Sequence, residues 1–246
     1  MFNFPHQIRY LNLDHRTERD EYMRSQFKKY GLTNTKRVSA SIFSEEKISG
    51  LKGNFLESHF KTQPRYMSVL VNRAEMIKDF LNDEDEDVCM MIEDDLSFLT
   101  TKYWNFDWFE FYEKLPKNWD CVQLHIIGEK YVPLKLVPWT RNNHSAACIL
   151  ITKRYAEKFV DMFFDNGWNF SHNYGYQDIG YHVHSGDFIP YQVGVTYSFP
   201  LFITNSKFIS DGYVKHENLM ARKSDATVLK WWKTNKKPIH QLMCLN

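Results

Sequence analysis

Three adjacent acidic residues, Glu93, Asp94 and Asp95, interrupt the apolar run VCMMIEDDLSFL at residues 88–99. Adjacent carboxylates repel one another and resist burial, so they need either a solvated strand end or a positive charge beside them. Clustered carboxylate oxygens are also ligands that Mg²⁺ and Mn²⁺ prefer, together with the phosphate groups of a substrate. The triplet alone leaves both interpretations open, a solvated strand end and a divalent-cation site.

A second group of polar residues lies in YLNLDHRTER, residues 10–19. Asn12 and Asp14 come at the end of an expected strand, and Arg16 and Arg19 stand three residues apart at the start of an expected helix. Two guanidinium groups beside a helix N-terminus favour the binding of a phosphate. A surface helix whose arginines pair with neighbouring glutamates would have the same residues, so this segment also has two interpretations.

Segments typical of strands and of helices alternate along the chain. Strands are expected at five places with β-forming or alternating apolar residues: 8–13, 35–40, 88–92, 120–127 and 146–151. Helices are expected at three places with amphipathic spacing: 18–30, 66–81 and 153–166. Thr17 and Thr152 would be the N-caps of the first and third helices, and Gly31 and Gly167 would end them. In a parallel sheet built from such units, ligands bind at the carboxyl ends of the strands, where the acidic triplet stands.

This alternation predicts an α/β fold in a single domain over residues 1–246, with a mostly parallel, Rossmann-like sheet and helices on both faces. A hydrophobic share of 43% is sufficient for a sizeable core in a chain of this length. The net charge of +1 gives no general argument for a nucleic-acid or membrane partner.

The cysteines indicate a reducing environment. Cys89, Cys121 and Cys148 lie in apolar runs, and the sequence has no CxxC pair, which predicts buried thiols rather than disulfides. Because the sequence shows neither a secretory signal nor an apolar run long enough for a membrane span, we expect a cytoplasmic protein.

The two polar groups, taken in chain order with four further segments, resemble glycosyltransferase family 25, the lipopolysaccharide-type and procollagen galactosyltransferase group. NLDHRTER (12–19) resembles the Asn-Leu-Asp-x-Arg-x-x-Arg opening of that family, and MIEDD (91–95) resembles its Leu-Glu-Asp-Asp version of the GT-A Asp-x-Asp motif. The further similar segments are NWDCVQLHIIG (118–128), HSAACILITKRYAEKFV (144–160), YQDIGYHV (176–183) and FPLFITNSKFISD (199–211). One segment departs from the family: in MSVLVNRAEM (67–76), Val71-Asn72 stands where Ser-His is expected.

The resemblance implies a GT-A fold and a metal-dependent glycosyltransferase. Such an enzyme would move a sugar, galactose or another hexose, from a nucleoside-diphosphate sugar, expected to be a UDP-sugar, to a hydroxyl of a glycan or another acceptor, with inversion. A divalent ion, Mn²⁺ or Mg²⁺, would stabilise the negative charge that develops on the leaving diphosphate. The implied metal ligands are Asp95, Glu93 and, late in the chain, His216, and Asp178 in YQDIGYHV would be the general base. The implied donor-binding residues are Asn12, Asp14, Arg16, Arg19, Glu93 and Asp94.

Two other functions are compatible with the same residues. Because the Ser-His pair is missing, the chain could be a non-catalytic sugar-binding module with a degenerate transferase fold. A metal-dependent nucleotidyltransferase or phosphohydrolase could also use an acidic triplet, but the sequence has neither GxxxxGK nor GxGxxG. His125, in the strand VQLHII, is interpreted as a core or sheet-edge residue with its hydrogen bonds satisfied, and WWKTNKK (231–237) as part of a packed C-terminal helix.

Overall fold

The computed structural model describes residues 3–43, 64–128, 131–165, 167–170, 186–208 and 215–244, and for residues 64–66 and 215–218 it describes the backbone only. Its helices are α1 (Thr17–Tyr30), α3 (Pro64–Leu81), α4 (Trp108–Glu113), α5 (Lys153–Phe163), α6 (Lys215–Thr234) and α7 (Ile239–Leu242), with 3₁₀ turns η3 (Leu99–Tyr103) and η4 (Ile189–Gln192). Its strands are β1 (Gln7–Leu13), β2 (Thr35–Ala40), β3 (Val88–Glu93), β4 (Leu96–Ser97), β5 (Cys121–Gln123), β6 (Ile127–Gly128), β7 (Val137–Pro138), β8 (Asn143–His144), β9 (Cys148–Thr152), β10 (Thr196–Ser198) and β11 (Ile203–Thr204).

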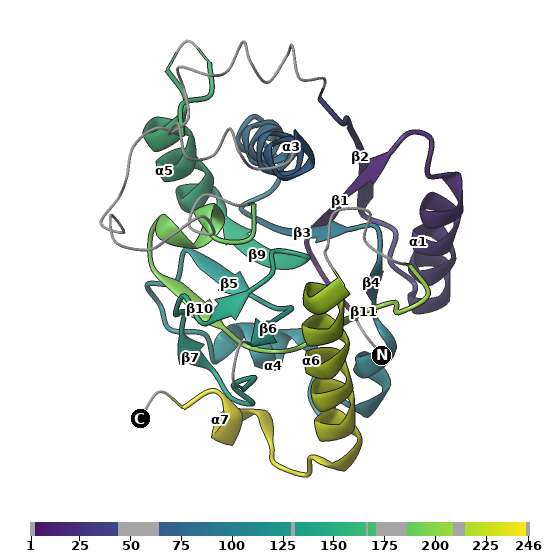
Figure 1. Ribbon diagram of the computed structural model, residues 1–246. Helices are drawn as coiled ribbons and strands as arrows, with labels where there is room; N and C mark the ends of the chain where they lie inside the picture. The colour runs from purple at the N-terminus through teal and green to yellow at the C-terminus, as the bar shows by residue number, and fades with distance from the viewer. Residues whose placement is uncertain are drawn as a thin grey trace.

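A seven-stranded sheet crosses the centre of the molecule in the order β2-β1-β3-β9-β5-β10-β7 (Figure 1). β1 pairs in parallel with β2 and β3, and β5 pairs in parallel with β10. β9 is antiparallel to both β3 and β5, and β7 is antiparallel to β10, so five of the seven strands run in one direction. The predicted mostly parallel α/β sheet is therefore confirmed. The direction of β9 places its first residues at the edge where β3 and β5 end.

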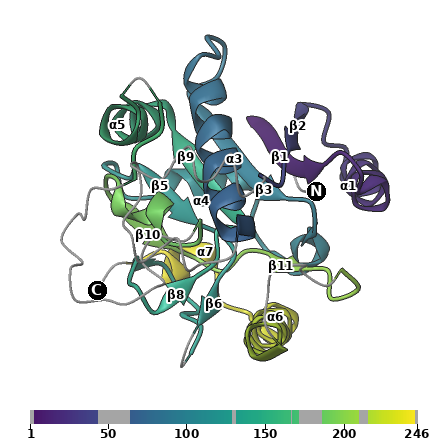
Figure 2. The same cartoon turned by 45° about the horizontal axis from the view of Figure 1, so that its top comes forward.

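Helices cover both faces of this sheet, as predicted. α3 and α5 pack on one face, whereas α1, α4, α6 and α7 contribute to the core on the other (Figure 2). The side chains of β3 alternate between the two cores: Val88, Met90 and Ile92 belong to one, and Cys89 and Met91 to the other. All five are buried, which is why this strand reads as a continuous apolar run until the acids begin.

Two of the predicted helix ends are confirmed. Gly31 follows α1 in the left-handed conformation, with φ 70°, and its N–H bonds back to the last turn of the helix. Thr152 is the N-cap of α5, because its hydroxyl accepts a hydrogen bond from the Tyr155 N–H at 3.1 Å.

The two other predicted ends were wrong. Thr17 is already inside α1, and the cap position is taken by Arg16, which makes no side-chain cap bond. α5 stops before Gly167, because Phe164 is extended and forms a β-bridge with Trp168. The rings of Phe164 and Trp168 are also in contact, with 5.0 Å between their centroids. The bridge stands where the last helical turn was predicted.

The strand predicted over 120–127 was too long, since β5 ends at Gln123. The N–H groups of Leu124 and His125 both donate to one carbonyl oxygen, that of Cys148, at 2.9 and 3.3 Å. The regular ladder is therefore interrupted at the point where His125 becomes part of the polar network described below.

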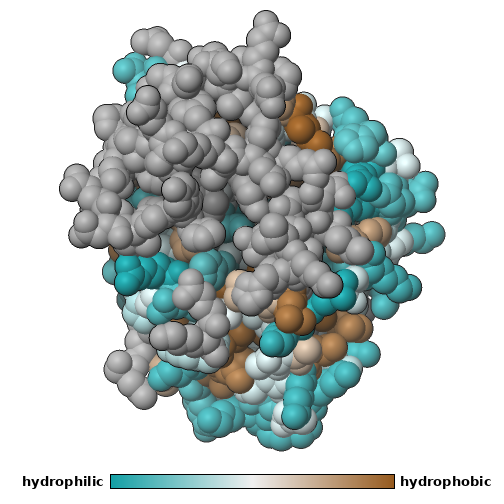
Figure 3. Space-filling view, in the orientation of Figure 1, coloured by the Kyte–Doolittle hydropathy of each residue, from teal (hydrophilic) through white to brown (hydrophobic). Residues whose placement is uncertain are grey.

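The predictions for three cysteines and for the C-terminal helix are confirmed. Cys89, Cys121 and Cys148 are buried free thiols, and Trp232 packs in the core under α6. The polar face of α1 is turned outward, and the surface over this helix is mostly hydrophilic (Figure 3). Among the helices of the described segments, none is long and apolar enough to cross a membrane.

The backbone of Gly194 packs directly against the buried carboxylate of Asp120. It has φ 69°, and a Cβ added there would lie 2.4 Å from Oδ2 of Asp120, a buried carboxylate that also accepts hydrogen bonds from Lys158 and from the Val195 N–H. We predict that Gly194→Ala lowers the free energy of unfolding by about 3 kcal/mol, because the new methyl group combines backbone strain with displacement of this carboxylate.

The matched control is Gly31→Ala. Gly31 has nearly the same φ, 70°, but nothing lies within 4 Å of its added Cβ, so only the cost of the left-handed conformation, about 1 kcal/mol, is expected. Denaturant unfolding of both variants measures the difference, and equal losses would contradict the role given to Asp120.

Candidate functional site

The candidate site lies at the carboxyl ends of β1 and β3. The chain leaves β1 for β2 on one side and later returns on the other side as β3, so these two strand ends form the topological switch point of the sheet. Open α/β sheets bind their ligands at such points. Leu11 of β1 pairs with Glu93, the last residue of β3, and a turn with Asp94 and Asp95 follows. We refer to Glu93–Asp95 as the acidic turn.

Asp94 is buried, and both of its carboxylate oxygens accept hydrogen bonds from the N-terminal segment. Nδ2 of Asn12 donates to Oδ2, and Nη1 of Arg19 donates to Oδ1, each at 2.8 Å. The Arg19 guanidinium also lies over the ring of Phe208, 5.2 Å from its centroid. The two polar groups singled out in the sequence therefore meet at Asp94.

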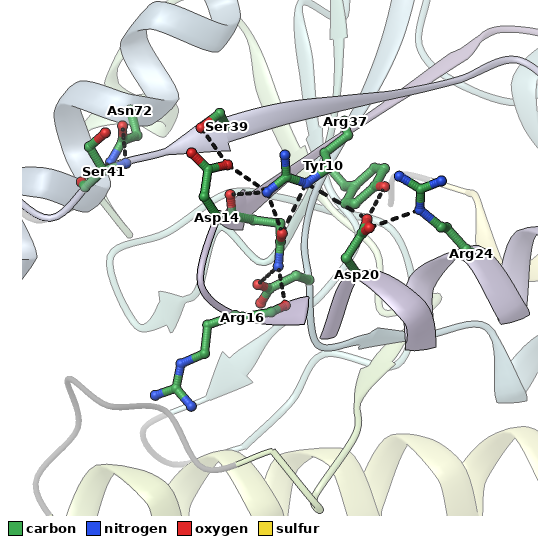
Figure 4. Close-up of polar contacts among 11 residues, drawn as sticks. Tyr10, Asp14, Arg16, Asp20, Arg24, Arg37, Ser39, Ser41 and Asn72 are labelled. Carbon is green, nitrogen blue, oxygen red and sulfur yellow. Dashed lines mark hydrogen bonds and ion pairs between the residues drawn. The ribbon is translucent and has the colours of Figure 1, made fainter. Parts of the chain in front are cut away.

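Arg37 of β2 orients the Asn12 amide. Its Nε and Nη2 donate to Oδ1 of Asn12 at 3.0 and 2.8 Å, so Nδ2 of that amide faces Asp94. Arg37 also donates to Asp14 at 2.7 Å and lies 3.7 Å from Asp20 (Figure 4). Sequence reasoning missed this residue, although its place in a short strand next to a polar strand end is a signal that could have found it.

Glu93 forms an ion pair with Arg73 of α3, a residue that sequence reasoning also missed. The Arg73 side chain is 2% exposed; it donates to Oε1 of Glu93 and to the carbonyl oxygen of Gly186. Burial raises the pKa of Glu93, and although Arg73 opposes this, the nearby Asp187 carboxylate helps to keep that pKa above its usual value. Burial lowers the pKa of Arg73, but the Glu93 and Asp187 carboxylates raise this pKa by more than burial lowers it, so the guanidinium stays charged.

Asp95 differs from its two neighbours. Its side chain is 13% exposed, Oδ2 lies 3.9 Å from Nη1 of Arg19, and Oδ1 is buried without a hydrogen-bond partner among the described residues. Burial, followed by repulsion from Glu93 and Asp94, raises the pKa of Asp95 to about 7, against the attraction of Arg19 and His125. The acidic turn thus contains two acids held by fixed partners and one with an unused oxygen.

His125 lies behind the acidic turn and is fully buried, as predicted for a satisfied core residue. Nδ1 is 2.6 Å from Oγ of Ser145, and Nε2 is 2.9 Å from Oδ1 of Asp225 on α6. Because a carboxylate only accepts, Nε2 carries a proton. Burial lowers the pKa of His125, but Asp225, with smaller contributions from Asp95 and Glu93, raises it above its usual value.

The site has more acids than bases. Its carboxyl groups are Glu93, Asp94, Asp95, Asp187 and Asp225, and its basic groups are Arg19, Arg73 and His125. Within the described segments, no three His, Cys, Asp or Glu side chains converge as a ready set of metal ligands. The unused Asp95 oxygen nevertheless fits a Mg²⁺ or Mn²⁺ ion that takes one or two protein carboxylates and completes its coordination with substrate phosphates and water.

The remaining predicted residues are placed less directly. Asp14 is 71% exposed, and hydrogen bonds from Arg37 and Ser39 lower its pKa. Arg16 forms an ion pair with Glu18 at 3.4 Å, and its guanidinium points away from Arg37 (Figure 4). Their roles in donor binding stay predictions.

Two predicted residues fall outside what the structure describes. Asp178, the expected general base, lies in the segment 171–185, which is outside the described residues. His216 belongs to the first turn of α6, but its side chain is outside the described part. At the position that departs from the family motif, the Asn72 amide bonds to the backbone N and O of Ser41, at 3.1 and 2.7 Å.

Comparisons with protein-family models and with curated proteins found no match. The interpretation of this site therefore depends on its ordered sequence motifs and on the geometry of the acidic turn.

Proposed function

We propose that this chain is a metal-dependent glycosyltransferase that moves a sugar, galactose or another hexose, from a nucleoside-diphosphate sugar to a hydroxyl acceptor, with inversion. The observation that carries the proposal is the unused carboxylate oxygen of Asp95, beside Arg19, at the switch point of the sheet. A cation ligand next to a guanidinium group is the combination that a diphosphate requires. UDP is the expected nucleotide, and a GT-A fold is the expected family architecture.

The described residues would have different roles in such a site. Asp95 would hold the Mn²⁺ or Mg²⁺ ion, which when bound neutralises charge on the leaving diphosphate. Arg19 would contact the same diphosphate, and Asp94 fixes Arg19 in place through its 2.8 Å bond. Glu93 uses Oε1 for Arg73, so a part in metal binding, shared with His216, stays a prediction.

A sugar-binding module without catalysis is the second candidate. It is favoured by one observation: where the family carries Ser-His, this chain has Val71 buried in the core and Asn72 bonded to Ser41. The Asn72 side chain holds the backbone after β2, and the chain has no histidine at this place.

A panel of nucleotide sugars, each tested with Mn²⁺ and with EDTA, distinguishes the candidates. Glycosyl transfer predicts Mn²⁺-dependent release of nucleoside diphosphate, greatest for a UDP-hexose and abolished by EDTA. Binding of a nucleotide sugar without release would favour the module. Absence of both binding and release across the panel, for a chain shown to be folded, would contradict the proposed function.

The general base is tested by Asp178→Asn. We predict a decrease of about 10²–10⁴-fold in turnover with little change in donor affinity, because a base acts on the acceptor hydroxyl and not on the diphosphate. Turnover by rapid quench and UDP affinity by calorimetry measure the two quantities separately. A loss of UDP affinity would place Asp178 in the donor site instead.

A further inference from the structure

Ser145, just before β9, has φ 83°. This is the left-handed region, which residues with a Cβ rarely adopt because the side chain approaches the backbone too closely. Strained residues of this kind persist where their surroundings hold them, and they are frequent at functional sites.

Buried polar side chains hold Ser145 in this conformation. Its Oγ contacts Nδ1 of His125 at 2.6 Å, and its carbonyl oxygen accepts hydrogen bonds from Nε2 of Gln123 at 2.8 Å and from the Tyr191 hydroxyl. The imidazole is itself fixed from the other side, because Nε2 donates to Asp225, which also accepts from the backbone and hydroxyl of Thr204.

The conformation of Ser145 determines how the next two residues meet the acidic turn. The carbonyl oxygen of Ala147, the residue before β9, accepts the N–H of Glu93 at 2.9 Å, and this bond continues the β3–β9 pairing to the first residue of the acidic turn. The N–H of Ala146 donates to Asp187 at 3.1 Å. A change of φ at Ser145 would rotate both peptides away from these partners.

We propose that His125 is a positioning residue of the candidate site: it holds Ser145 in the left-handed conformation, which keeps Ala147 bonded to Glu93 and so fixes the acidic turn. The choice of UDP and Mn²⁺ as the ligands of the test rests on the proposed function. The hydrogen bonds that lead from His125 through Ser145 and Ala147 to Glu93 do not depend on it. His125 touches no ligand in this role, and it acts through Ser145.

The test compares His125→Phe with the double variant His125→Phe/Ser145→Gly. Phenylalanine keeps a ring but removes both hydrogen bonds of the imidazole, so the Ser145 Oγ loses its partner and only the bonds from Gln123 and Tyr191 to the Ser145 carbonyl oxygen oppose a change of its backbone conformation. Glycine adopts that region without a penalty, so it restores access to the native loop even when the imidazole is absent. Ser145→Gly alone is the matched control.

The first readout is the affinity for UDP in the presence of Mn²⁺. We expect His125→Phe to weaken it about 5- to 30-fold, which corresponds to the cost of the left-handed conformation of a residue with a Cβ. The UDP affinity of the double variant should be within about threefold of the affinity of Ser145→Gly, because glycine removes the conformational penalty. An unchanged affinity in His125→Phe, or a loss that glycine does not repair, would overturn the proposal, and the second of these would point to the imidazole charge instead.

The second readout is hydrogen exchange of the Glu93 amide, which is independent of any ligand. Its exchange should be faster in His125→Phe and slower again in the double variant, with unfolding monitored separately. His125→Gln, which keeps a polar side chain, replaces His125→Phe if the latter does not fold. A wild-type chain without UDP affinity would count against the proposed function alone, because the exchange rates still decide the positioning role.

Discussion

Asp95→Asn is expected to abolish Mn²⁺-dependent release of nucleoside diphosphate and, at the same time, to make the folded chain more stable at pH 8. The first effect follows from the unused Oδ1 of Asp95, because an amide is a much weaker ligand for Mn²⁺ than a carboxylate. We expect a loss of turnover on the order of 10³-fold, equivalent to removing most of the charge stabilisation that the ion gives to the diphosphate.

The second effect follows from the pKa of Asp95. Burial and the two neighbouring acids raise this pKa to about 7 in the folded state, from an ordinary value of 3.8. The folded chain therefore binds a proton more tightly than the unfolded chain, and the stability linked to this proton is present below about pH 4 and lost as the pH rises toward 7. Asparagine has no charge to lose, so the variant should gain on the order of 2–4 kcal/mol at pH 8 and little at pH 4.

Asp94→Asn is the matched control, because the same change is made one residue away. Asp94 accepts bonds from Asn12 and Arg19, so its loss removes charge-assisted contacts and should lower the free energy of unfolding by about 1–3 kcal/mol. Denaturant unfolding at pH 4 and pH 8, with and without Mn²⁺ and UDP, measures both variants. An Asp95→Asn chain that keeps its Mn²⁺-dependent turnover, or that is destabilised at pH 8 like Asp94→Asn, would contradict the role given to Asp95.

The meeting of the two polar groups could be predicted from the sequence, since parallel strands end at a common edge. Asn12 is the next-to-last residue of β1 and Asp94 follows β3, and these two strands are neighbours. Strand ends are marked locally, by the change from apolar to polar residues, and therefore need no knowledge of distant contacts. The same locality explains why Gly31 and Thr152 were placed correctly as helix ends.

The different environments of the three acids could not be predicted in this way. They depend on partners distant in the sequence, Arg73 for Glu93 and Arg19 for Asp94, whereas nothing within the triplet distinguishes one carboxylate from another. Arg73 did leave a signal: it lies among buried residues of α3, between Leu70 and Ala74, where a charged side chain must have a partner.

The direction of β9 also could not be predicted from the local sequence pattern. A buried strand such as CILIT has apolar side chains on both faces whichever way it runs, so periodicity carries no information on its orientation. The orientation matters here, because it brings Ser145 and Ala147 to the edge that holds the acids. The left-handed φ of Ser145 is likewise set by tertiary contacts, and not by its own preference.

Arg73→Met is expected to produce a large loss of stability, about 2–4 kcal/mol, because it removes the buried counter-charge of the Glu93 carboxylate, which is itself 32% exposed and therefore partly screened by solvent. The loss should depend on pH. The pKa of Glu93 is already raised, and without Arg73 it rises further, so the folded variant binds a proton at position 93 more readily at low pH and must hold an unpaired, partly buried charge at high pH. Denaturant unfolding should therefore show a greater loss at pH 8 than at pH 5.

The double variant Arg73→Met/Glu93→Gln identifies the cause. If the loss comes from the unpaired charge, glutamine at position 93 should recover about half of it or more, since buried ion pairs can be replaced by neutral groups with little net cost. A loss that is equal at both pH values and is not recovered would assign the effect to the bond between Arg73 and the Gly186 carbonyl instead. Recovery would mean that the Arg73–Glu93 pair adds little net stability, and that its effect is to favour the charged form of the Glu93 carboxylate at the switch point of the sheet, where the proposed cation and diphosphate would bind.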